Sequence, residues 1–289
     1  MTEPTTHTLD VPGALLTYDV RSNTSSTAPV LLMIGSPMGA AGFGTLAGHF
    51  SDRTVVTYDP RGVERSRKAA DTTESTPDQH ADDLHRVISD LGGGPVDLFA
   101  SSGGAVNALA LVARHPEEVR ILVAHEPPLI PTLPDAEAAE RAIARVRDAY
   151  QAKGRGTGMA AFIAMTSWRG EFTDEYFAQP APDAAQFGMA TEDDGSRDDP
   201  LLSDRSAAVS GFRPDFEALA AVPTRIVIAV GEESLGTFTG RSAVATAELL
   251  GQQATVFPSH HGGFLGGEFG YAGQPEAFAR RLREVLQDS

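Results

Sequence analysis

The chain of 289 residues contains no cysteine. This absence excludes disulfide bonds, thiolate metal sites and cysteine nucleophiles. Positive charge is scarce as well, because 23 Lys and Arg residues stand against 39 Asp and Glu residues and the formal net charge is −16. A surface of this sign repels a phosphate backbone and anionic lipid, so neither nucleic acid nor a membrane is an expected partner.

Long apolar runs are missing too. No stretch approaches the roughly 20 apolar residues that a membrane-spanning helix needs. The segment from Met1 to Pro12 lacks the basic start and apolar run of a secretory signal, so we expect a cytoplasmic protein. Hydrophobic residues make up 41% of the chain and charged residues 21%, as in ordinary globular proteins with a substantial core.

Short apolar stretches alternate with amphipathic helical patterns along two parts of the chain. Strands are predicted at residues 6–10, 14–21, 30–34, 54–58, 96–100, 119–124, 224–230 and 254–257. This alternation predicts an α/β fold in which helices cover both faces of a mostly parallel sheet.

The strand pattern stops between residues 129 and 221. Helices are predicted there at 135–152 and 159–168, on either side of a glycine-rich break. We therefore expect a core made of residues 1–128 and 222–289, with a helical cap formed by residues 129–221.

A pair of serines lies where one apolar stretch meets a helix rich in small residues. A sharp turn from strand to helix presents a serine hydroxyl above the end of a sheet, and its crowding requires small residues two positions before and after the serine. Ser102 meets this requirement with Ala100 and Gly104, whereas Ser101 has Phe99 on one side. The pattern therefore predicts Ser102 as a nucleophile.

A serine hydroxyl needs a base within hydrogen-bond reach and a carboxylate that orients the base. On this architecture the expected order along the chain is serine, acid, histidine. His260 and His261 follow the last predicted strand, with Gly262 and Gly263 behind them. Both histidines are therefore candidate bases.

Together these features resemble the α/β-hydrolase superfamily over nearly the whole chain. The features are the strand pattern, the helical insertion, the late histidine, Ala-Ser-Ser-Gly-Gly at 100–104 and Asp-Pro-Arg-Gly at 59–62. The resemblance implies that Ser102 is the nucleophile and that the N–H of Gly103 forms half of an oxyanion hole. The family's His-Gly matches Ile34-Gly35, so the next residue, Ser36, would supply the second N–H.

The resemblance also bears on the base and the acid. The family's Pro-Gly-Gly-His-Gly places His261 rather than His260 on the base. The usual acid position, in Gly-x-x-Asp after the strand ending at residue 230, holds Ser234. Glu232 or Glu233 could supply the carboxylate from a shifted loop. Alternatively the acid lies one strand earlier, as in some family members, where Glu126 is found.

The expected activity is cleavage of an ester or lactone of a small, hydrophobic substrate through an acyl-enzyme. No cofactor is implied, and no metal site is predicted, because His80 and His85 lie five residues apart and do not share one helix face. Two alternatives remain. One is a C–C bond hydrolase or a cofactor-free perhydrolase or haloperoxidase with the same triad, and the other is a ligand-binding protein with negligible turnover.

Overall fold

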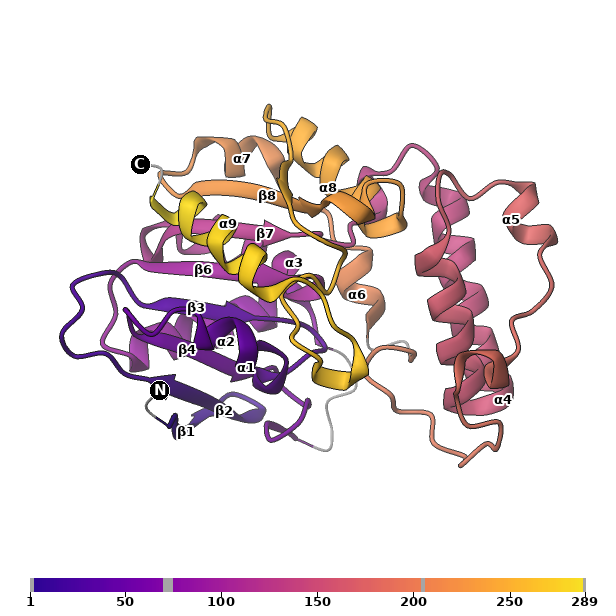
Figure 1. Cartoon of the computed structure of the whole chain (residues 1–289), viewed down its shortest axis with the longest axis horizontal. Coiled ribbons are helices and arrows are strands. Elements are labelled where there is room, and N and C mark those ends of the chain that lie inside the picture. The colour runs from indigo at the N-terminus through magenta and orange to yellow at the C-terminus, as the bar shows by residue number, and fades with distance from the viewer. Residues whose placement is uncertain (1–2, 70–74, 204–205, 288–289) are drawn as a thin grey trace.

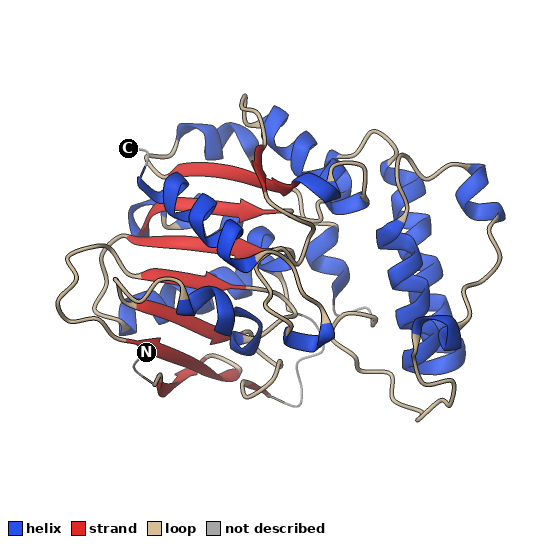
Figure 2. Ribbon diagram, viewed as in Figure 1, coloured by secondary structure: helices blue, strands red, loops and turns tan. Residues whose placement is uncertain are grey.

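The computed structural model of the chain describes residues 3–69, 75–203 and 206–287. A nine-stranded sheet forms its centre, and helices cover both faces (Figures 1 and 2). Apolar side chains on the two faces of the sheet form two separate core clusters. The predicted α/β fold is confirmed.

The strand order is β1-β2-β4-β3-β6-β7-β8-β9, with β5 pairing to β2. From β4 onward the neighbouring strands are parallel, whereas β1, β2 and β4 pair antiparallel. The strands are β1 (Thr5–Val11), β2 (Ala14–Arg21), β3 (Leu31–Ile34), β4 (Val55–Asp59), β5 (Arg67–Lys68), β6 (Val96–Ser101), β7 (Val119–His125), β8 (Arg225–Gly231) and β9 (Thr255–Phe257).

The core helices lie against this sheet. They are α1 (Gly44–Gly48), α2 (Pro77–Asp90), α3 (Gly103–Arg114), α7 (Phe216–Ala221), α8 (Phe238–Leu249) and α9 (Pro275–Gln287). Sequence signals explain the start of α2, where the Thr76 hydroxyl accepts from the Gln79 N–H and Pro77 occupies the first turn. Helix α8 begins at Phe238, where the Thr237 hydroxyl accepts from the Gly240 N–H as a cap.

Helices α4 (Ala136–Ser167), α5 (Asp174–Ala178) and α6 (Ala207–Ser210) lie between β7 and β8 in the chain. Figure 1 shows α4 and α5 beyond the carboxyl ends of the parallel strands. The two helices predicted around a glycine-rich break are one element, α4, with a kink at Gly154, where φ is +80°. The glycines serve close packing, since a Cβ on Gly156 would lie 1.7 Å from the Ala190 carbonyl oxygen.

No helix in the described part of the chain is long and apolar enough to span a lipid bilayer.

One ion-pair network reaches into the core, where Asp97 and Arg53 are buried and Arg120 is 35% exposed. Asp97, on β6, has no exposed surface and accepts hydrogen bonds from Arg53 at 2.5 Å and from Arg120 at 2.7 Å. We expect Asp97→Asn to lower the free energy of unfolding by about 3 kcal/mol, because it leaves the buried charge of Arg53 without a counter-charge. Urea unfolding measures this change.

The matched control is the surface pair of Asp52 and Arg283, whose side chains are 59% and 35% exposed. Water screens such a pair, so Asp52→Asn should cost less than about 1 kcal/mol. If Asp97→Asn and Asp52→Asn lower the free energy of unfolding equally, Asp97 does not stabilise the fold more than a surface ion pair does.

Candidate active site

Ser102 occupies the turn between β6 and α3, with φ at +56° and ψ at −130°. Residues with side chains rarely adopt such angles, and they do so where the surrounding structure holds them. The turn is as crowded as its sequence suggests, since a Cβ on Gly104 would lie 2.8 Å from the Gly35 Cα. Ser102 lines a cavity of about 810 Å³.

The loop after β3 lies directly against this turn. A Cβ on Gly103 would be 2.6 Å from the Ser36 carbonyl oxygen, so only glycine fits there. Ser36 and Gly103 both line the cavity beside Ser102. The first N–H groups of a helix have no acceptor within the helix, which leaves the Gly103 N–H, at the start of α3, available to a bound oxygen atom.

Glu126 directly follows β7 and has no exposed surface. Its Oε1 accepts the Gly231 N–H at 2.9 Å, and its Oε2 accepts the Thr239 hydroxyl at 2.6 Å. The same Oε2 is 2.6 Å from His261 Nδ1. The backbone of Glu126 is strained, with φ at +48°. Three separate segments of the chain therefore converge on one buried carboxylate.

The carboxyl group of Glu126 is held in its charged form. Burial by itself raises the pKa of a carboxyl group, but the charge of His261 and the hydrogen bond from its ring act in the opposite direction. The Thr239 hydroxyl adds to this effect, so the pKa of Glu126 lies well below its usual range. A charged Glu126 favours a proton on Nδ1 of His261, which leaves Nε2 as the basic nitrogen.

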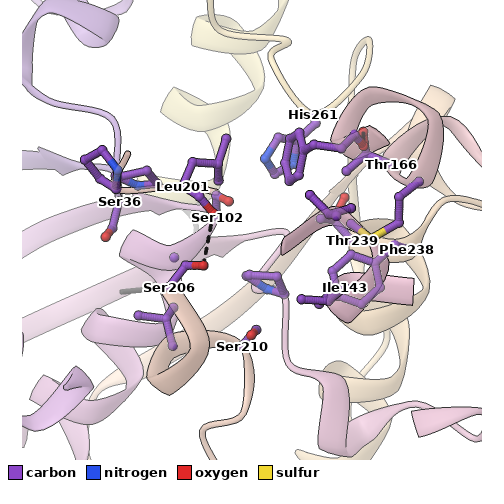
Figure 3. Close-up of a pocket in the computed structure, with 18 of the residues that line it drawn as sticks. Ser36, Ser102, Ile143, Thr166, Leu201, Ser206, Ser210, Phe238, Thr239 and His261 are labelled. Atoms are coloured by element: carbon purple, nitrogen blue, oxygen red, sulfur yellow. Dashed lines mark hydrogen bonds between the residues drawn. The ribbon is translucent and has the colours of Figure 1, made fainter. Parts of the chain in front are cut away.

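The two adjacent histidines face different surroundings. Both line the cavity, but His261 contacts Glu126, whereas His260 Nε2 is 3.2 Å from the Ala272 carbonyl oxygen and its ring packs on Tyr271. Figure 3 shows Ser102 and His261 on the walls of the same cavity. Within the described residues, no hydrogen bond joins the Ser102 hydroxyl to His261 in this conformation.

Neither alternative glutamate reaches His261. Glu232 Oε1 accepts the Ser259 N–H at 3.3 Å, and the Glu233 side chain is exposed at the rim of the cavity. Among the hydrogen bonds of the described residues, His261 therefore has Glu126 as its carboxylate partner. Neither Glu232 nor Glu233 is hydrogen-bonded to it.

Two residues of this cluster escaped the sequence analysis. Thr239 lies 113 positions after Glu126, and nothing local marks it as a partner. His125 is fully buried, its Nδ1 is hydrogen-bonded to the Ser101 hydroxyl at 3.1 Å, and its ring packs 5.9 Å from that of His261. The sequence did contain one signal for His125. It is a polar residue at the end of an apolar strand, at the carboxyl edge of a parallel sheet.

The cavity has a volume of about 810 Å³. Apolar side chains form much of its lining. They are Ile143, Val146, Phe162, Ile163 and Met165 of α4, Leu201 from the segment before α6, Val209 of α6 and Phe238 of α8. Basic side chains also reach its lining, namely Arg61, Lys68, Arg147 and Arg169. The space is therefore large enough for an organic molecule of moderate size with an apolar portion.

Comparisons with known proteins agree with this architecture. A family model described as alpha/beta hydrolase fold matches residues 28–170. The uncharacterized hydrolase YraK of Bacillus subtilis is 32% identical over 288 residues, which span 97% of this chain and 95% of the relative.

Solved structures are similar over nearly their whole length. A thermophilic esterase from Thermogutta terrifontis matches with a TM-score of 0.62 and 22% identity, covering 99% of this chain and 98% of the other. The enol-lactonase from Burkholderia xenovorans matches with a TM-score of 0.66 and 15% identity, covering 98% of this chain and all of the other. At these identities the likeness concerns the fold.

Because His125 is buried, we expect the free energy of unfolding to depend on pH. Burial lowers its pKa from 6.5 to about 4, against the attraction of the Glu126 charge. Between these two values the unfolded chain binds a proton that the folded chain does not, so stability falls as the pH falls from 6.5 to 4. Upon acidification from pH 7 to pH 4, wild type should lose about 3 kcal/mol more free energy of unfolding than His125→Gln.

Urea unfolding of both proteins at the two pH values measures this difference. The control is His49→Gln, which replaces an exposed histidine and should follow wild type. If His125→Gln and wild type lose equal stability on acidification, His125 is not held neutral by burial.

Proposed function

The chain belongs to the α/β-hydrolase family, and we propose that it is a serine hydrolase that cleaves an ester or lactone through an acyl-enzyme. The observation that carries the proposal is the 2.6 Å contact between His261 and the buried Glu126, on the wall of a cavity that the strained Ser102 also lines. A base with an orienting carboxylate beside a candidate nucleophile is the arrangement that acyl transfer requires.

In the proposed reaction, His261 Nε2 takes the hydroxyl proton of Ser102 as the serine oxygen attacks the substrate carbonyl. The N–H groups of Ser36 and Gly103 stabilise the resulting oxyanion. His261 gives the proton to the leaving alkoxide as the C–O bond breaks, and the acyl group stays on Ser102. Water then attacks the acyl-enzyme after losing a proton to His261, which returns that proton to Ser102.

The missing hydrogen bond between Ser102 and His261 is compatible with this role. Catalytic hydrogen bonds are often long in the absence of substrate and shorten when it binds. Glu126 holds the His261 ring through Nδ1, which leaves Nε2 to accept the Ser102 hydroxyl when substrate binds.

The apolar wall of the cavity favours an apolar group on the substrate. Ile143, Val146 and Phe162, all on α4, lie with Phe238 on this wall, and burial of each methylene of a substrate is worth about 0.8 kcal/mol. The esterase and the enol-lactonase among the structural neighbours support carboxylic esters and lactones as the first substrates to test.

Replacement of the proposed nucleophile is the primary test. Ser102→Ala should lower kcat/KM on p-nitrophenyl esters by about four orders of magnitude or more, with an unchanged far-UV circular dichroism spectrum. The neighbouring serine offers a matched control, because the Ser101 hydroxyl is hydrogen-bonded to His125 and turned away from the cavity. Ser101→Ala should keep turnover within about tenfold of wild type.

A fluorophosphonate gives a second readout that does not depend on the substrate chosen. It should label wild type and Ser101→Ala but not Ser102→Ala, as mass spectrometry of the intact chain would show. Substantial esterase activity or labelling in Ser102→Ala would refute the mechanism, and absence of labelling in wild type would favour a binding protein.

The second test concerns the acid. Glu126→Gln should lower kcat by about 10³- to 10⁴-fold, because the amide no longer stabilises the protonated imidazole ring of His261. Glu232→Gln and Glu233→Gln are matched controls that should stay close to wild type. If either control loses as much activity as Glu126→Gln, the acid has been assigned to the wrong loop.

A further inference from the structure

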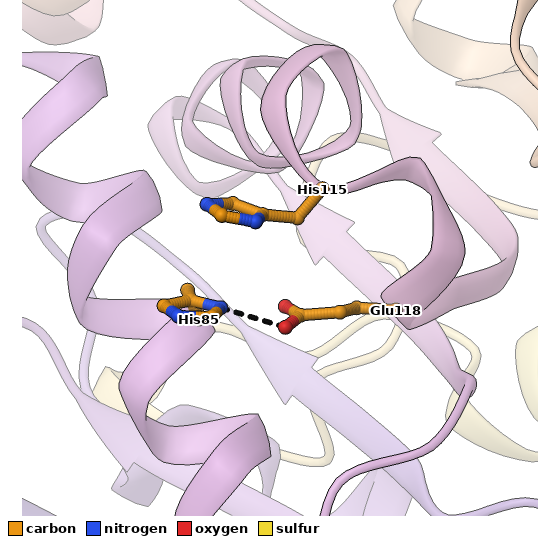
Figure 4. A group of neighbouring side chains, drawn as sticks. All are labelled: His85, His115 and Glu118. Atoms are coloured by element: carbon orange, nitrogen blue, oxygen red, sulfur yellow. Dashed lines mark hydrogen bonds and ion pairs between the residues drawn. The ribbon is translucent and has the colours of Figure 1, made fainter.

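Three potential metal ligands meet at the end of α3 that lies away from Ser102 (Figure 4). His85 lies on α2, His115 directly follows α3, and Glu118 ends the short helix η2 (Pro116–Glu118) before β7 begins. One ligand atom from each of these side chains lies within 4.8 Å of the other two. The sequence analysis paired His85 only with His80, because the other two residues lie about thirty positions further along the chain.

Within this cluster, one oxygen of the Glu118 carboxylate has no hydrogen-bond donor. Glu118 Oε1 is 2.6 Å from His85 Nδ1. Glu118 Oε2 is buried and has no hydrogen-bond partner among the described residues. A buried acceptor without a donor costs free energy, and a cation at this position would remove that cost.

The two imidazole rings also lie close together. Those of His85 and His115 are stacked, with 4.1 Å between their centroids and an angle of 9° between their planes. The Glu117 carboxylate lies 3.9 Å from His115 Nδ1 and adds another negative group. A single divalent ion between the rings would compensate the negative charge of these carboxylates.

We propose that His85, His115 and Glu118 bind a divalent transition-metal ion of the Zn²⁺ type. Imidazole nitrogen and carboxylate oxygen are both ligands of zinc, at about 2.0–2.2 Å. Ligands at these lengths in a tetrahedron lie about 3.3 Å apart, so the side chains need to move by about 1 Å. The nitrogen lone pairs of stacked rings lie in parallel planes and do not meet at one point, so one ring must tilt, and His85 is 37% exposed and has room to do so.

The donor set distinguishes among cations. Mg²⁺ and Ca²⁺ prefer oxygen ligands, of which the three side chains offer only the Glu118 carboxylate. Imidazole suits zinc and its neighbours in the transition series. Water or the exposed Glu117 carboxylate completes the coordination of the ion.

The bound ion would connect α2 to the turn between α3 and β7. Helix α3 has 12 residues and is about 18 Å long, and Ser102 stands at its other end. The ion therefore does not touch the reacting atoms of the proposed hydrolysis. Its effect is on stability, because a ligand that binds the folded chain raises the melting temperature.

Calorimetric titration of the untagged, chelator-treated chain with ZnCl2 tests the proposal. We expect one Zn²⁺ per chain, no detectable heat of binding from MgCl2, and a rise in Tm of about 5 °C at a Zn²⁺ concentration one hundred times the Kd. A wild-type chain that binds no Zn²⁺ would refute the proposal.

Variants locate the ion. His85→Gln and His115→Gln should abolish Zn²⁺ binding and the Tm rise, and Glu118→Gln should weaken binding by more than about tenfold. His49→Gln, at an exposed histidine elsewhere, should bind as wild type does. Circular dichroism without metal checks that each variant folds. If a histidine variant does not fold, the Zn²⁺ affinity of Glu118→Gln tests the site in its place.

Binding that is unchanged in the folded variants would place the ion elsewhere, for example at His261, and would overturn the assignment. Because Ser102 is remote from the cluster, hydrolysis by Ser102 in His85→Gln should remain within about twofold of wild type. Failure of the metal test would thus leave the proposed hydrolysis untouched, and failure of the Ser102→Ala test would leave the metal site untouched.

Discussion

The buried charge of Glu126 is the constraint that organises this end of the molecule. A carboxylate without exposed surface is stable only when hydrogen bonds and opposite charge replace the water it has lost. The partners of Glu126 come from 105, 113 and 135 residues further along the chain: the Gly231 N–H, the Thr239 hydroxyl and the His261 ring. Burying Glu126 therefore ties the ends of β7 and β8, helix α8 and the loop after β9 into one unit.

The parallel sheet makes this convergence possible. Adjacent parallel strands end at the same edge, and the order β3-β6-β7-β8-β9 aligns the loops that carry Ser36, Ser102, Glu126 and His261 along that edge. Glycines then allow the backbones to touch, since a Cβ on Gly103 would meet Ser36 and a Cβ on Gly231 would lie 2.6 Å from the Ser259 carbonyl oxygen. Strain at Ser102 and Glu126 is maintained by this close packing.

The two ends of α3 carry different chemistry. Near its first turn, the strained Ser102 and His261 line a cavity of about 810 Å³, to whose lining α4 also contributes, and the buried Glu126 carboxylate holds His261. At its last turn, His115 and Glu118 meet His85 with one carboxylate oxygen unsatisfied. The first arrangement favours reaction of a bound molecule, whereas the second favours a cation that joins neighbouring elements. The rigid helix keeps the two apart, so each is open to separate experiment.

Local patterns in the sequence determined the α/β fold, the sharp turn at Ser102 and the histidines after the last strand, because strand and helix periodicity and the size of neighbouring side chains are properties of short segments. They left three glutamates as candidate acids, and they indicated neither Thr239 nor the grouping of His85 with His115 and Glu118. Only the tertiary structure decided that Glu126, and not Glu232 or Glu233, contacts His261. The physical reason is that such contacts join residues far apart in the chain, and their proximity depends on strand order, loop course and the need to compensate a buried charge.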